Sequence, residues 1–181
     1  MTNGSTQNRT ELWIWGGAGI LITLWALRPI WDMDIWWHIA LGRLIAENGL
    51  PDTDPLSLGR EGVAWATFQG GYEWTMAFIE EVWGLVGVRW IHALAIGSGM
   101  ALFGFSVARS TGSRIIAFAA ILLLLFLYED RIRVRPHVFH FLAMSWMLTC
   151  LSRTHFQWNY RDLFHIIPVM FIWSTFHGPA S

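Results

Sequence analysis

The chain has 181 residues, of which 54% are hydrophobic and 14% are charged. Soluble domains usually carry about a quarter charged residues, so this composition indicates an integral membrane protein. The net charge is −1 and the sequence contains no lysine, so it offers no basic surface of the kind that attracts nucleic acid, and a nucleic-acid partner is excluded.

In chain order, a polar N-terminal tail (residues 1–11) comes first, and five apolar segments follow within a single transmembrane domain (residues 12–181). A bilayer core about 30 Å thick requires roughly 20 apolar residues per helix, and the segments approach this length. Tryptophans near the segment ends suit the headgroup zone. The sequence predicts an all-α integral membrane protein with about five transmembrane helices: Leu12–Leu27, Val88–Ala108, Ile115–Tyr128, Val138–Leu151 and Leu163–Phe176.

A long loop, residues 28–87, follows the first segment and is predicted to hold two helices that lie along the membrane surface. The first begins near Asp34 and runs to about Asn48, where Asn-Gly and a proline indicate a helix stop. The stretch LPDTDPLS comes next and has the prolines and aspartates typical of turns. The second helix runs from about Tyr72 to Val86 and mixes aromatic with acidic residues, as interfacial helices do.

Five crossings would place successive loops on opposite sides of the membrane. The long loop, the stretch EDRIRVRPH after the third segment and HGPAS after the fifth would then face the same compartment. Arginines occur on both sides, so the positive-inside rule gives no orientation. The parity of the crossings predicts that three separated polar stretches share one aqueous layer.

Two aspartates and a histidine stand at the start of the long loop, in the stretch WDMDIWWH. Either Asp32 or Asp34 could act as a general base, or both acids with His38 could hold a divalent cation. The structural alternative is a helix cap, because Asp34 directly precedes a predicted helix and aspartate is a preferred N-cap residue.

A second polar cluster precedes the fourth segment and consists of Arg131, Arg133, Arg135 and His137. Guanidinium groups bind phosphate in a bidentate fashion and stay charged near lipid, so these residues are candidates for binding a phosphate or a lipid headgroup. The alternative is anchoring at the membrane surface, with ion pairs to Glu129 and Asp130.

Three further histidines lie within or at the ends of apolar segments. His92 and His140 could ligate the iron of a haem or the magnesium of a chlorophyll or bacteriochlorophyll, since imidazole is a common metal ligand. His177 ends the fifth segment and could be catalytic or form an interfacial hydrogen bond. Small residues near His92 predict a close helix-packing face: Ala93, Ala95, Gly97, Gly99 and Gly104.

Three ordered motifs, DMDIWWHIALGRLIAENGLPDTDPLSL, RPHVF and WSTFHG, resemble a family of bacterial polytopic membrane proteins that looks like part of the GT-C class of lipid-linked glycosyltransferases. The resemblance spans residues 31–178. It implies that Asp32 and Asp34 belong to the acidic element of the first external loop, which positions the acceptor and, in some members, a metal. The other matching positions are Trp36, Trp37, His38, Gly42, Pro51, Asp54, Pro55, Ser57, Arg135, Pro136, His137, His177 and Gly178.

The sequence departs from the family pattern near its end. Pro179 and Ala180 stand where the family has a second glycine and an aromatic residue, and Ser181 is the last residue, where relatives continue into further helices. The resemblance implies that those helices hold the long polyprenyl substrates. Catalysis is therefore not expected of these 181 residues alone.

The expected function is that of an accessory or scaffold subunit of a larger membrane complex, photosynthetic or respiratory in kind. We expect it in the bacterial inner (plasma) membrane, with the long loop in the periplasm and with lipids and other transmembrane subunits as partners. One alternative is a glycosyltransferase, or a fragment of one, that uses a polyprenyl-phosphate-linked donor at the external face. The other is a subunit that binds haem or chlorophyll.

Overall fold

The structure, a computed structural model, describes residues 3–59, 62–129, 132–153 and 160–176. These residues form six α-helices and no strand: α1 (Asn3–Ala26), α2 (Asp34–Asn48), α3 (Gly70–Thr111), α4 (Arg114–Leu127), α5 (His137–Arg153) and α6 (Tyr160–Phe176). An isolated antiparallel bridge joins Thr53 to Ala64 in the loop between α2 and α3. The predicted all-α class is confirmed.

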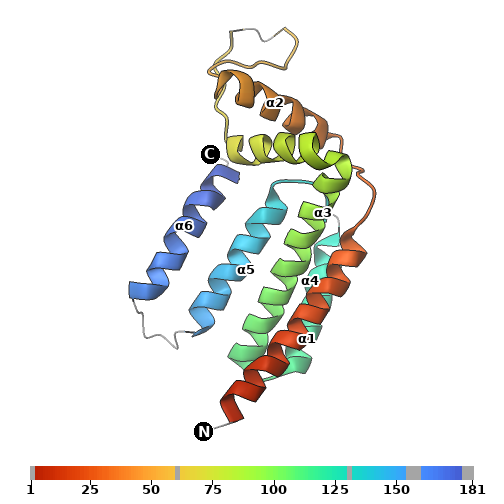
Figure 1. Cartoon of the computed structure of the whole chain (residues 1–181), viewed down its shortest axis with the longest axis vertical. Helices are drawn as coiled ribbons and strands as arrows, with labels where there is room; N and C mark the ends of the chain where they lie inside the picture. Colours follow the sequence, from red (N-terminus) through yellow and green to blue (C-terminus); the bar gives the residue numbers. More distant parts are fainter. Residues whose placement is uncertain (1–2, 60–61, 130–131, 154–159, 177–181) are drawn as a thin grey trace.

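The helices divide into two parts, which Figure 1 shows together. The bundle consists of α1, α4, α5, α6 and residues 85–111 of α3, which run roughly along the long axis. The crossing layer consists of α2 and residues 70–83 of α3, which lie across one end of the bundle. The N-terminus lies at the far end, whereas α6 ends beside the crossing layer.

A break at Gly84 joins the two parts. Its φ of 64° and ψ of −168° lie outside the helical region, in a conformation that glycine adopts readily because it has no Cβ. The sequence predicts two separate helices here, one ending near Val86 and one starting at Val88. The structure likewise has two helical stretches, which meet at a kink at Gly84. The prediction of two helices agrees with it, and the predicted boundary lies a few residues too far along the chain.

Among the described residues, α3 is the one helix that is long and apolar enough to cross a membrane. The helix α4 has 14 residues, or about 21 Å at 1.5 Å per residue, which is shorter than a bilayer core of about 30 Å. The helix α1 has 24 residues, but it begins at Asn3 and so includes most of the predicted polar tail. Helix length and composition alone do not support about five transmembrane helices.

Small residues allow the helices of the bundle to approach closely. A Cβ at Gly97 of α3 would overlap the hydroxyl of Thr23 and the carbonyl of Gly19 on α1, and one at Gly104 would lie 2.6 Å from side-chain atoms of Trp15 and Ile121. Where two helix backbones nearly touch, there is no room for larger side chains, and the closely packed atoms are stabilised by dispersion contacts. Close packing is confirmed for the predicted glycines, although they do not share one face: Gly97 and Gly104 lie against α1, whereas Gly99 lies against Phe141 of α5.

The crossing layer is held by a second close contact. A Cβ at Gly42 of α2 would overlap the backbone carbonyl of Glu73 on α3 and would lie 2.8 Å from Ala77. Ile35 and Ile39 of α2 are buried on the same interface, one helical turn apart. The predicted interfacial helix over residues 34–48 is confirmed as a helix with the same boundaries.

Candidate functional site

The main polar cluster joins the start of α2 to the segment before α5. The guanidinium of Arg135 donates to both carboxylate oxygens of Asp32, the Nη2–Oδ1 distance being 3.2 Å. The same Nη2 lies 2.8 Å from Oδ2 of Asp34. Asp32 and Arg135 are 103 residues apart in the sequence, and the structure brings them together, which is compatible with the expectation that the two polar stretches face the same compartment.

The two aspartates have different environments. The Asp32 side chain is 3% exposed, whereas that of Asp34 is 47% exposed. Burial by itself would raise the pKa of Asp32, but the hydrogen bonds from Arg135 and from the Asp34 amide outweigh it and lower the pKa below its usual value. The same bond raises the pKa of Arg135. Asp32 is therefore an ionised structural group, and Asp34 is the carboxylate that faces solvent.

The predicted cap at Asp34 takes another form. The residue in the N-cap position of α2 is Met33, whose side chain makes no capping bond. The Asp32 carboxylate accepts the backbone amide of Asp34 at 3.1 Å, so Asp32 satisfies one of the amides that a helix start leaves unpaired. It binds this amide and Arg135 at the same time.

His38 lies apart from the two aspartates, in the interface between α2 and α3. Its Nδ1 is 3.4 Å from Oε1 of Glu73, and both side chains are buried. The edge of the Tyr72 ring packs against the His38 ring at a centroid distance of 5.0 Å. Among the described residues, no three His, Cys, Asp or Glu side chains gather as a metal site. The guanidinium of Arg135, and not a metal ion, lies between the two aspartates, so these residues do not fit the predicted divalent-metal site.

Tyr72 and His92 form a buried hydrogen bond of 3.0 Å between the phenol oxygen and Nε2. The other ring nitrogen, Nδ1, lies 2.7 Å from the carbonyl of Val88. Because a carbonyl only accepts, Nδ1 carries the proton, and the phenol donates to Nε2. Burial raises the pKa of Tyr72 well above its usual value, and nearby Asp32 and Glu73 raise it further, which keeps the phenol protonated.

These bonds bear on the predicted cofactor ligands. Both ring nitrogens of His92 have protein partners, which leaves neither nitrogen to ligate a haem iron or a chlorophyll magnesium. On α5, Nδ1 of His140 accepts the indole N–H of Trp173 at 2.8 Å, and the two rings pack edge to face. The bond fixes the position of the His140 ring against α6.

The arginine cluster is divided between two places. Arg135 points to the aspartates, whereas Arg133 lines a separate pocket, and Arg131 lies outside the described residues. His137, the first residue of α5, is partly buried. His177 also lies outside the described residues, but Phe176 before it packs against Tyr72 at a centroid distance of 6.2 Å.

The pocket that Arg133 lines has a volume of about 420 Å³ and lies where the crossing layer meets the bundle. Two further arginines line it, Arg28 just after α1 and Arg89 just after the Gly84 break. The sequence motifs indicate neither of these two arginines as a site residue. Their position in the sequence could have indicated a site, because each lies at the end of an apolar segment that faces the long loop.

No known protein family, no curated protein and no solved structure matches this chain. The resemblance to GT-C glycosyltransferases therefore stays a prediction.

Proposed function

We propose that this chain is a multi-pass membrane protein that serves as an accessory or scaffold module of a larger membrane assembly. Large apolar side chains on the outer surfaces of the bundle support the membrane location. Phe126 on α4 is 77% exposed, and Phe171 on α6 is 72% exposed. Such side chains are stable against lipid or other transmembrane helices and unstable against water. In this proposal the helices of the bundle cross the bilayer together, and the crossing layer lies at its external surface.

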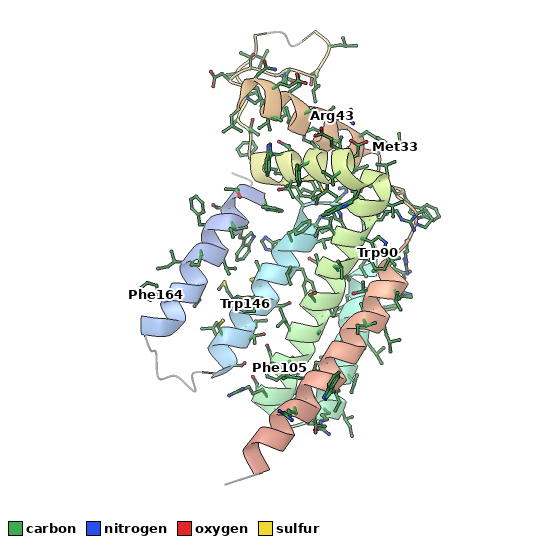
Figure 2. All side chains as sticks on the ribbon, in the orientation of Figure 1. Met33, Arg43, Trp90, Phe105, Trp146 and Phe164 are labelled. Atoms are coloured by element: carbon green, nitrogen blue, oxygen red, sulfur yellow. The ribbon has the colours of Figure 1, made fainter. Side chains whose placement is uncertain are left out.

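The observation that carries the assembly role is an apolar groove of about 480 Å³ between α3, α5 and α6. Its walls include Ala143 and Trp146 on α5 and Val169 and Ile172 on α6. Figure 2 shows Trp146 on α5 and Phe164 near the start of α6. Side chains on both walls leave a gap instead of interdigitating, and a helix with small residues on one face would fill it.

Filling the groove tests this proposal. We expect that Ala143→Trp, expressed in native membranes, will release the subunits that co-purify with the chain in mild detergent. The matched control is Leu122→Trp, because Leu122 is 67% exposed on α4, away from the groove. Co-purification that survives Ala143→Trp, or a native chain that is monodisperse and alone, would overturn the assembly role.

A second candidate function is glycosyl transfer, and the exposure of Asp34 favours it. In this reaction Asp34 takes the proton of an acceptor hydroxyl, whose oxygen forms a bond to the anomeric carbon of the sugar, while the sugar–phosphate bond of a polyprenyl-linked donor breaks and the polyprenyl phosphate leaves. Asp34→Asn should then abolish transfer in a membrane assay with a labelled lipid-linked sugar, without dissociating the assembly. Equal activity of Asp34→Asn and the native chain would remove this candidate.

A further inference from the structure

The pocket between α1, α3 and the segment before α5 has the composition of an anion site. Three arginines from three separate parts of the chain line it, Arg28, Arg89 and Arg133, and one acidic residue, Glu129, lies among them. The formal charge of the lining side chains is therefore positive, although that of the chain is −1. Three guanidinium groups against one carboxylate leave an excess of positive charge, which a bound anion would offset.

Two of these arginines are already held in place. Arg89 donates from Nε to the carbonyl of Arg28 at 3.0 Å and from Nη2 to that of Leu27 at 3.2 Å. These two bonds satisfy carbonyls that the end of α1 leaves without helical partners, and they do not use Nη1 of Arg89. The guanidinium of Arg28 lies 4.1 Å above the ring of Trp25. Binding of a ligand here would therefore cost little side-chain conformational entropy.

The ion pair inside the pocket is weak. Arg28 and Glu129 are 3.6 Å apart, and the Glu129 side chain is 61% exposed. Exposed pairs with this spacing contribute little. A phosphate, which accepts two parallel N–H bonds from one guanidinium, is a stronger partner for Arg28 than this carboxylate.

The walls of the pocket also fit a lipid. Trp31, which is 78% exposed, lies on one side, and Ile96 and Ile132 form apolar parts of the lining. Tryptophan favours the headgroup layer, where a polar group meets the first methylenes of an acyl chain. The pocket thus offers cationic and apolar surfaces side by side.

We propose that Arg28, Arg89 and Arg133 bind a phosphate group in this pocket, either as the headgroup of an anionic phospholipid or as free phosphate. The lipid source rests on the proposed membrane location, but the phosphate chemistry does not. Asp32 and Asp34 do not line this pocket, and both pair with Arg135 instead.

The test uses the full chain purified in a neutral detergent. Inorganic phosphate is titrated by calorimetry in one arm, and retention of phosphatidylglycerol over phosphatidylcholine is measured by native mass spectrometry in the other. Arg133→Gln should weaken binding roughly ten-fold, as expected for loss of a charge-assisted hydrogen bond. Glu129→Gln should strengthen it, because it removes the competing carboxylate. Arg43→Gln is the control, since Arg43 pairs with Glu80 on the crossing layer outside the pocket.

The outcomes separate the sources. Binding in the calorimeter that Arg133→Gln weakens and Arg43→Gln leaves unchanged supports a phosphate site, and selective retention of phosphatidylglycerol identifies the lipid as its source. Absence of binding in both arms, or equal weakening by Arg43→Gln, would overturn the proposal. A native chain that purifies alone yet binds phosphate would overturn the assembly role and leave this site standing.

Discussion

The crossing layer and the bundle bury polar groups in different ways. The crossing layer and the loops beside it bury ionisable side chains, among them Asp32, His38 and Glu73, and pair them with residues of other segments. The bundle buries hydroxyls such as those of Ser106 and Thr149, each of which bonds to a carbonyl four residues earlier in its own helix. Its buried imidazole, His92, bonds to Tyr72 of the crossing layer. A hydroxyl can satisfy itself locally, whereas a buried charge requires a partner from elsewhere in the fold.

This difference determines which part is sensitive to single substitutions. A truncation in the bundle removes one local bond and leaves its helix intact. A truncation in the crossing layer leaves a buried charge or a buried acceptor without its partner. The crossing layer should therefore respond more strongly to changes in polar groups, and the following substitutions test that expectation.

The largest effect is expected from Arg135→Ala. It leaves the Asp32 carboxylate buried without a counter-ion and should lower the free energy of unfolding by about 3 kcal/mol. Thermal unfolding in detergent, followed by tryptophan fluorescence, measures the loss. Arg114→Ala removes an ion pair to Glu11 at the opposite end of the bundle, where the Arg114 side chain is 46% exposed, and should cost less than about 1 kcal/mol. Equal losses would contradict the contrast.

A slightly smaller effect is expected from Gly42→Ala. The added Cβ would overlap the Glu73 carbonyl, so α2 must move away from α3 at a cost of about 2 kcal/mol. Gly16→Ala is the control, because nothing lies within 4 Å of a Cβ at Gly16 in α1. That control should stabilise the helix by up to about 1 kcal/mol. Limited proteolysis of the loop between α2 and α3 reports whether the crossing layer has loosened.

Removing one hydroxyl from each part gives a direct comparison. Tyr72→Phe leaves the buried Nε2 of His92 without a donor and should cost about 1.5 kcal/mol.

Ser106→Ala removes a hydroxyl that bonds to Leu102 and Thr149, but Thr149 keeps its bond to Ser145, so the cost should be about 0.5 kcal/mol. A larger loss for Ser106→Ala in the same unfolding assay would reverse the order.

The smallest effect is expected from acid. The pKa of Asp32 is lower in the folded chain than its usual value of 3.8, so the unfolded chain binds the proton more tightly. The stabilisation from Asp32 is complete above the unfolded pKa and is lost as the pH falls through the folded one. A titration from pH 6 to about pH 3 should therefore show a steeper fall in stability for the native chain than for Asp32→Asn. Parallel curves would show that Asp32 does not contribute.

The sequence predicted regular elements better than contacts. The limits of α2 agree with the Asn-Gly stop and with the aspartates before the helix, because these signals act within a few residues. The predicted break lies near Gly87 and not at Gly84, since these two glycines are equivalent as local signals and only packing selects one. The structure extends α1 to Asn3, into residues whose polar side chains predict a tail. Polar residues of this kind can continue a helix beyond its apolar segment.

The site was predicted only in its location. Because Arg133 and Arg135 alternate along the sequence, they were expected to form one cluster. The backbone after α4 is irregular, however, so Arg135 points to the aspartates and Arg133 lines the pocket. Parity indicated that these residues share one end of the molecule, which agrees with the Asp32–Arg135 contact. No periodic pattern could identify Arg28 and Arg89 as partners of Arg133, because their proximity depends on how α1 packs against α3.

The bond between Asp32 and Arg135 also imposes an order on biosynthesis. Asp32 emerges from the ribosome 103 residues before its partner, so for most of translation this carboxylate must remain hydrated. The start of α2 can dock only after α3 and α4 have been made. The ion pair therefore forms only after Arg135 has been synthesised, and the contact of Phe176 in α6 with Tyr72 at the same end forms later still.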